Sequence, residues 1–180
     1  MNAMLEITEI RETTAEDIRF AFATFSLGTV LVAASEMGVA AILMGDDREA
    51  LTREVMSAFP DARLAADEAG LEEAIAKVVA FLEAPKMGLD LRLDIRGNTL
   101  ERAVWQALRA VPSSETITYG QIAKALPLPA TAQEVGAACA ANVLAVAIPC
   151  HRVVKADGSI SGYRWGVQRK RKLINREAVA

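Results

Sequence analysis

The stretch 17–44 constrains the fold most, because its apolar segments are short and separated by turns. Bulky residues alternate with small or charged ones at its start, and the segment 26–29 supplies a first turn. Apolar residues then fill 30–34 and 39–44, on either side of a second turn at 36–38. Short apolar segments joined by tight turns are typical of antiparallel hairpins. The sequence therefore predicts a small antiparallel meander near the start of the chain.

Two amphipathic helices and a linker are predicted after the meander. The acidic pair 46–47 offers an N-cap for a helix that continues to about Phe59, where a proline stops it. Apolar residues at helical spacing predict a second helix over 71–82. The segment 85–88 is typical of a linker, and a short strand is expected over 89–95. This half contains no catalytic constellation, so we interpret it as a scaffold.

Short helices are predicted to dominate the second half of the chain. Capping-box sequences at 98–101 and 118–121 each open a helix, and a third helix, rich in small residues, is expected over 131–141. The last two resemble a helix-turn-helix, although many helical corners share this pattern. Trp105 and Cys139 are interpreted as core residues, because each lies among apolar neighbours.

The net charge of −3 hides a division between the two halves. Residues 1–89 hold 7 Lys and Arg against 16 Asp and Glu, whereas residues 90–180 hold 13 against 7. The two parts therefore carry net charges of −9 and +6. This asymmetry indicates either a basic face that meets an anionic partner or two halves that attract each other. The last helix, expected over about 167–178, either contacts phosphate or is a solvated face; its basic residues are Arg169, Lys170, Arg171, Lys172 and Arg176.

Several protein classes are excluded by composition. No uncharged apolar segment approaches the roughly 20 residues that a membrane span needs. The first residues lack the basic and apolar regions of a signal peptide. Two cysteines and one histidine are too few for a zinc cluster. We therefore expect a cytoplasmic protein with reduced cysteines, no metal and no cofactor.

The candidate reactive group lies in Ile148-Pro149-Cys150-His151-Arg152-Val153, which holds the only histidine of the chain. Proline fixes its own φ and has no N–H to donate, so the cysteine is presented from stiff backbone. A thiolate is a strong nucleophile when a neighbouring base favours it. An inert buried cysteine beside a surface histidine would have the same local sequence. The loop 161–166, bounded by glycines, is a candidate for gripping a substrate.

This hexapeptide, preceded by Ala140-Ala141-Asn142 and followed by Ser161-Gly162-Tyr163-Arg164-Trp165-Gly166, resembles the O6-alkylguanine-DNA alkyltransferases. The similarity is greatest to the C-terminal half of the bifunctional Ada-type proteins. It extends back through 94–97 and 104–108, and it covers the chain after about residue 15. The cysteine cluster of the regulatory half of Ada-type proteins is absent. The chain is thus either a stand-alone protein or a fragment of a longer one.

The resemblance implies an α+β fold with two domains. Residues 1–88 would form a ribonuclease H-like domain of sheet and helices, and residues 89–180 a helical domain with a winged helix-turn-helix. It further implies a monomer that binds double-stranded DNA through the minor groove and flips the damaged base into a pocket. The implied activity is direct-reversal repair: one alkyl group moves irreversibly from O6-alkylguanine, or O4-alkylthymine, to the cysteine.

The resemblance also implies the role of each catalytic residue. Cys150 would attack the alkyl carbon, His151 would act as its base through a water, and Glu177 would hold the imidazole. Tyr119 would donate a proton towards N3 of the guanine, and Asn142 would tie the recognition helix to the active-site segment. The Cys150 carbonyl would contact the substrate. Further substrate contacts are implied for Pro149, Val153, Ser161 and Gly162.

The expected DNA contacts contain one departure from the family. The resemblance implies that Tyr119 contacts the DNA, together with Gln133, Ala137, Ala138 and Arg152. The family usually carries an arginine, at the position of Gln133, that fills the space left by the flipped base. Glutamine is shorter and uncharged, so we expect weaker DNA binding or slower flipping with the chemistry retained.

Two other classes of protein remain open from the residues. A non-catalytic lesion-binding protein of the alkyltransferase-like type shares the fold but carries another residue, often tryptophan, at the cysteine position. A Cys-His-Glu hydrolase would turn over repeatedly without DNA, but no glycine-rich oxyanion loop adjoins Cys150.

Overall fold

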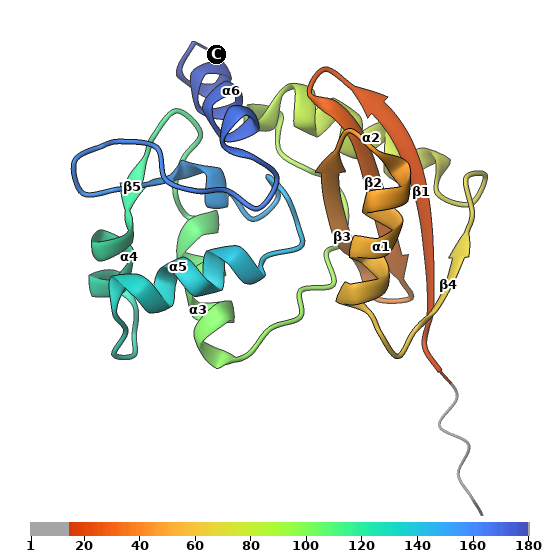
Figure 1. Cartoon of the computed structure of the whole chain (residues 1–180), viewed down its shortest axis with the longest axis horizontal. Helices are drawn as coiled ribbons and strands as arrows, with labels where there is room; N and C mark the ends of the chain where they lie inside the picture. The colour runs from red at the N-terminus through yellow and green to blue at the C-terminus, as the bar shows by residue number, and fades with distance from the viewer. Residues whose placement is uncertain (1–14, 180) are drawn as a thin grey trace, which may run out of the picture.

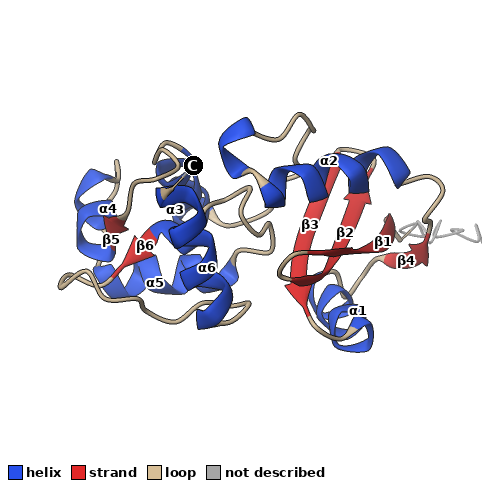
Figure 2. Ribbon diagram, turned by 90° about the horizontal axis from the view of Figure 1, so that it is seen from above, coloured by secondary structure: helices blue, strands red, loops and turns tan. Residues whose placement is uncertain are grey.

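The computed structural model describes residues 15–179 and has an α+β fold. A four-stranded sheet with two helices forms one side of the molecule, and the remaining helices gather on the other (Figure 1). Seen from above, α1 and α2 lie on opposite faces of the sheet (Figure 2).

The predicted meander is confirmed. β1 (Asp17–Phe25), β2 (Gly28–Ser35) and β3 (Gly38–Gly45) pair in antiparallel succession, and β4 (Arg63–Ala66) adds to β1 in parallel. The sheet order is therefore β3-β2-β1-β4. β2 and β3 are buried along nearly their whole length because helices cover both faces.

The two helices on the sheet begin and end close to their predicted bounds. α1 spans Arg48–Ala58, and the Asp47 carboxylate accepts from the Glu49 N–H as its N-cap. α2 spans Glu72–Glu83 and packs on β1 and β2. Their apolar faces bury Val55 and Leu82 in the main core.

The prediction of a strand over 89–95 is wrong. After a short 3₁₀ turn at Pro85–Met87, the chain is extended and makes one isolated bridge, between Leu93 and Val39. The Val39 N–H donates to the Arg92 carbonyl and the Val39 carbonyl accepts from Asp94. The Asp94 carboxylate accepts hydrogen bonds from Ser35 and Arg96.

The helical half contains α3 (Thr99–Arg109), α4 (Tyr119–Ala125), α5 (Ala132–Ala141) and α6 (Val167–Ala178). Both predicted capping boxes, Asn98 with Glu101 and Thr118 with Gln121, are formed. Trp105 is buried as expected, and its indole N–H donates to the Ala138 carbonyl at 2.9 Å.

Two short strands complete the helical half. β5 (Ile117–Thr118) and β6 (Val153–Val154) pair in parallel, with Ile117 opposite Val153 and Thr118 opposite Val154. They join the start of α4 to the segment that carries the predicted nucleophile. No helix in the described chain, 15–179, has the length and apolar content to cross a membrane.

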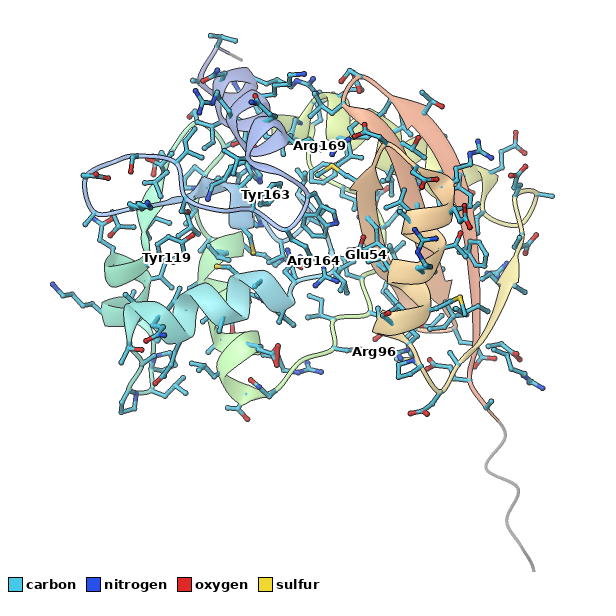
Figure 3. The ribbon with its side chains drawn as sticks, viewed as in Figure 1. Glu54, Arg96, Tyr119, Tyr163, Arg164 and Arg169 are labelled. Atoms are coloured by element: carbon cyan, nitrogen blue, oxygen red, sulfur yellow. The ribbon has the colours of Figure 1, made fainter. Side chains whose placement is uncertain are left out.

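Ion pairs connect the acidic and basic halves. The Arg164 guanidinium lies 2.9 Å from Glu54 of α1, and the Arg169 guanidinium lies 2.6 Å from Asp46; Figure 3 shows Arg164 reaching Glu54 across the junction. These pairs agree with an attraction between the halves, one of the two interpretations of the charge division, and a basic face for an anionic partner stays a prediction. A phosphate contact by the exposed Arg171 and Lys172 stays a prediction.

Candidate active site

The segment that leads to Cys150 is anchored to the sheet. The Ile42 N–H of β3 donates to the Val143 carbonyl at 2.8 Å, and the Ala145 N–H donates to the Ile42 carbonyl at 3.0 Å. Cys150 then opens a one-turn 3₁₀ helix, Cys150–Arg152, directly before β6. The nucleophile is therefore carried on backbone that is fixed at both ends.

Cys150 is 5% exposed and lines a cavity of about 170 Å³. The cavity is lined by residues of α4, of α5 and of the predicted loop 161–166. Besides Cys150 these are Tyr119, Gly136, Cys139, Ala140, Gly162, Tyr163 and Arg164. A larger hollow of about 580 Å³ lies beside Phe59 and Arg96, but none of the predicted catalytic residues lines it.

Asn142 joins α5 to the active-site segment, as the sequence predicted. Its side-chain amide donates to the Ile148 carbonyl at 3.0 Å and contacts the Cys150 Sγ at 3.4 Å. Its side-chain oxygen accepts from the Leu144 N–H at 2.8 Å. The residue is buried, so these bonds hold the end of the helix and the cysteine in a fixed relation.

His151 and Glu177 are in contact as predicted. The His151 Nε2 lies 2.8 Å from the Glu177 Oε1, and both side chains are buried. Burial lowers the pKa of His151 below its ordinary 6.5 and outweighs the attraction of Glu177. Burial also opposes ionisation of Glu177, but hydrogen bonds from His151 and Arg152 lower its pKa to about 2. The resting pair is therefore a neutral imidazole beside a carboxylate.

Arg152 supplies the charge that balances this carboxylate. Its guanidinium donates to both oxygens of Glu177, at 3.0 and 2.9 Å, and to the Val111 carbonyl at 2.7 Å. The side chain is buried, with its donors directed inward. This placement corrects the prediction that Arg152 contacts DNA: the residue supports Glu177.

Lys170 is a site residue that the sequence did not predict. It was placed on the basic outer face of the last helix, yet it is buried and its ammonium donates to the Ser161 Oγ at 2.9 Å and to the Gly162 carbonyl at 3.4 Å. The Ser161 Oγ also hydrogen-bonds the Tyr119 hydroxyl. Lys170 stands one and two turns before the buried Leu173 and Glu177, and this spacing could have indicated its inward direction.

These contacts affect two ionisable groups at the cavity. Burial raises the pKa of Tyr119, although the hydrogen bond with Ser161 acts to lower it. Burial lowers the pKa of Lys170, opposed by the two cysteines nearby. The phenol is therefore held as a proton donor, next to a cation that can stabilise its anion.

Cys139 packs against the main core as predicted, but it is also a cavity residue. It is half-buried and lines the same cavity as Cys150. The adjacent Cys139 thiol and burial raise the pKa of Cys150 well above its ordinary value, whereas the Asn142 amide and the Lys170 charge act to lower it. Cys150 therefore needs a base to become a nucleophile.

The face of α5 expected to meet DNA is partly as predicted. Gln133 and Ala137 are exposed, one turn apart, with Ala140 next along the same face. Ala138 points into the core, and its carbonyl is taken by Trp105, which corrects its assignment to the DNA surface.

Of the residues predicted beside the substrate, Gly162 lines the cavity, whereas Pro149 lines a separate hollow. Gly162 is exposed, Ser161 is half-buried, and Pro149 and Val153 are buried next to Cys150. The Val153 N–H donates to the Cys150 carbonyl, which leaves one lone pair of that oxygen for a further donor.

Comparison with known proteins identifies the family. The family model described as "6-O-methylguanine DNA methyltransferase, DNA binding domain" matches residues 99–179. This range contains Cys150, His151 and Glu177. The methylated-DNA–protein-cysteine methyltransferase of Mycobacterium bovis is 37% identical over 111 residues, covering 62% of this chain and 67% of that protein. The chain belongs to this family. The resemblance of the Cys150 segment to this family is confirmed.

Further relatives place the chain within the family. The bifunctional transcriptional activator/DNA repair enzyme Ada of Escherichia coli is 48% identical over 161 residues, which cover 89% of this chain and 46% of Ada. The chain thus spans about half the length of that relative. The crystal structure of the Mycobacterium tuberculosis O6-methylguanine methyltransferase has a TM-score of 0.73 at 27% identity, covering 90% of this chain and 93% of that one. A structure of the same protein in complex with DNA has a TM-score of 0.73 at 28% identity, covering 91% and 93%.

Proposed function

We propose that this chain repairs alkylated DNA by direct reversal, moving one alkyl group from O6-alkylguanine or O4-alkylthymine to Cys150. The observation that carries the proposal is the placement of Cys150 in a small cavity beside a buried His151, Glu177 and Arg152. The names of the methyltransferase relatives support it. A lesion-binding protein without chemistry has no need of this ionised, hydrogen-bonded cluster, whose burial is costly.

The cluster sets up His151 as a base. The Glu177 carboxylate accepts from Nε2 and so fixes the tautomer whose Nδ1 carries a lone pair. That Nδ1 is buried and makes no hydrogen bond within residues 15–179. It takes the thiol proton of Cys150 through a water, since buried polar atoms without a protein partner are where such waters bind.

The thiolate then displaces guanine from the alkyl carbon. A carbon–sulfur bond forms as the carbon–oxygen bond breaks, and negative charge develops on the guanine. Tyr119 donates its proton towards N3, and the Lys170 ammonium, through Ser161, stabilises the phenolate that results. The thioether product has no good leaving group, so each molecule acts once.

The DNA-binding mode belongs to the same proposal. The exposed small residues of α5 allow close approach to a minor groove, with α4 and α5 as a helix-turn-helix and the β5–β6 pair as its wing. Flipping brings the base to Cys150, which it cannot reach from within the stack. We assign residues 1–88 to a ribonuclease H-like domain and 89–180 to the alkyl-accepting domain of a monomer, with 1–14 and 180 outside the described residues. Two free thiols suit the reducing cytoplasm.

Methyl transfer tests the proposal directly. Incubation with duplex DNA that carries O6-methylguanine, followed by peptide mapping, should place a single methyl group on Cys150 and reach a plateau at one per protein. A lesion-binding protein would retain its original mass while still binding the DNA. Repeated turnover, or methyl on another residue, would also contradict the proposal.

Gln133→Arg should strengthen binding to duplex DNA and speed repair on it. Gln133 is exposed in the first turn of α5, so a guanidinium there can reach both a phosphate and the gap left by a flipped base. One added phosphate contact increases affinity several-fold at low salt and steepens the salt dependence by about one unit. Fluorescence anisotropy at several salt concentrations measures this. The rate with free O6-benzylguanine serves as the control, and equal gains on both substrates would refute a role in flipping.

A further inference from the structure

The chain has two cysteines, and both line the cavity described above. They come from different elements, Cys139 from α5 and Cys150 from the 3₁₀ turn before β6. The proposed alkyl transfer uses only Cys150. Cys139 is thus a second potential nucleophile beside the first, without a role in the reaction.

The geometry of α5 brings the two thiols together. Asn142, the C-cap of this helix, contacts the Cys150 Sγ at 3.4 Å. Cys139 lies three residues earlier, on the same helical face, and its N-terminally directed side chain faces the same cavity. Its carbonyl accepts from the Asn142 N–H at 3.2 Å, so both residues belong to one rigid helical end.

Two groups act against the burial that raises the pKa of Cys150, and His151 is the base that can take its proton. The buried Lys170 ammonium places a positive charge near both sulfurs, and Asn142 donates a hydrogen bond to one of them. Tyr119 and Tyr163 face the cavity as neutral phenols, and Arg164 lies at its rim. Cys139 is half-buried, so one sulfur of the pair is partly exposed at the cavity.

We propose that Cys139 and Cys150 form a reversible disulfide when hydrogen peroxide oxidises the protein. The Cys150 thiolate attacks one peroxide oxygen, forming a sulfenic acid and releasing hydroxide. The Cys139 sulfur then attacks the sulfenic sulfur; a sulfur–sulfur bond forms, and the hydroxyl leaves as water with the Cys139 proton. Two thiols are oxidised by two electrons and one peroxide is reduced. A dithiol reverses the reaction.

The consequence for a single-use protein rests on the proposed function. A disulfide prevents Cys150 from accepting an alkyl group, but it also stops the sulfenic acid from proceeding to the sulfinic acid, which dithiols do not reduce. Cys139 therefore preserves an unused acceptor through oxidative exposure. The protein would be switched off reversibly instead of being lost.

Mass spectrometry of the wild-type chain tests this without any variant. After treatment with hydrogen peroxide, non-reducing peptide mapping should show the Cys139 and Cys150 peptides linked, in a monomer lighter by two hydrogens. Dithiothreitol should restore both free thiols and methyl uptake from O6-methylguanine DNA. A reduced protein that takes up no methyl would contradict the proposed function, whereas the linked peptides would still support the disulfide.

Two variants isolate the role of each sulfur. In Cys139→Ala, the same peroxide dose should carry Cys150 to the sulfinic acid, and dithiothreitol should recover almost none of the methyl uptake measured before oxidation. Cys139→Ser is the second choice if the alanine variant is unstable. In Cys150→Ala, Cys139 should stay a free thiol at that dose. The proposal is overturned if wild-type Cys150 reaches the sulfinic acid while Cys139 stays free, or if the disulfide forms only between two chains.

Discussion

Cys150→Ala is expected to abolish alkyl transfer completely while the protein stays folded and still binds DNA. The substitution removes the sulfur that contacts Asn142 and lies next to His151 in sequence. It leaves Glu177 bonded to Arg152, so no buried charge loses its partner. The cost in unfolding free energy is that of one small buried side chain, about 1–2 kcal/mol.

Three measurements separate lost chemistry from lost structure. Methyl uptake from O6-methylguanine duplex should fall to zero by mass spectrometry, affinity for the same duplex should stay within a few-fold, and the thermal transition should remain cooperative. Cys139→Ala is the matched control, because it removes the other cavity sulfur and keeps Cys150 as an acceptor. Uptake of methyl by Cys150→Ala at any site would show that Cys150 is not the acceptor.

Local sequence signals predicted the elements that depend on local physics. The meander followed from apolar segments between turns, and α3 and α4 followed from capping boxes whose reciprocal hydrogen bonds lie within four residues. The contact of His151 with Glu177 was different in kind. It spans 26 residues of sequence and was implied by family resemblance alone.

The misses share a tertiary cause. β4 has four mostly exposed residues, and only its pairing with β1 makes it a strand. Lys170 and Arg152 have charged side chains of a type that is usually exposed, but their neighbours in the fold bury them. Lys170 is buried because Ser161 and Gly162 supply acceptors for its ammonium, and those acceptors come from a loop whose path the sequence did not reveal.

Glu177→Gln is expected to reduce both stability and reactivity. The change keeps the side-chain shape but leaves the buried Arg152 guanidinium without its charge partner, at 2.9–3.0 Å from a neutral amide. Breaking a buried ion pair in this way costs about 3–5 kcal/mol. The amide also no longer fixes the His151 tautomer, so methyl transfer should slow by about 10²-fold or more, as for a lost general base.

The pH dependence of the free energy of unfolding should also report the buried Glu177 and His151. The pKa of Glu177 lies near 2 in the folded chain and near 4.5 when unfolded, so its contribution, on the order of 3 kcal/mol, is complete above pH 4.5. That contribution disappears as the pH falls from 4.5 towards 2. The pKa of His151 is also lowered by folding, so its contribution is complete above its ordinary 6.5 and declines below it. The wild-type chain should therefore lose stability on acidification in both windows.

Comparison of two variants isolates the buried pair from the other carboxylates. Urea unfolding between pH 3 and pH 7 should show that the difference between wild type and Glu177→Gln is largest at neutral pH and shrinks below pH 4.5. The Asp46 carboxylate is 86% exposed, and Asp46→Asn breaks its ion pair with Arg169. This substitution should lower the free energy of unfolding by less than about 1 kcal/mol at any of these pH values. Equal effects of the two substitutions, or a Glu177→Gln difference that grows on acidification, would mean that burial of this cluster does not set its energetics.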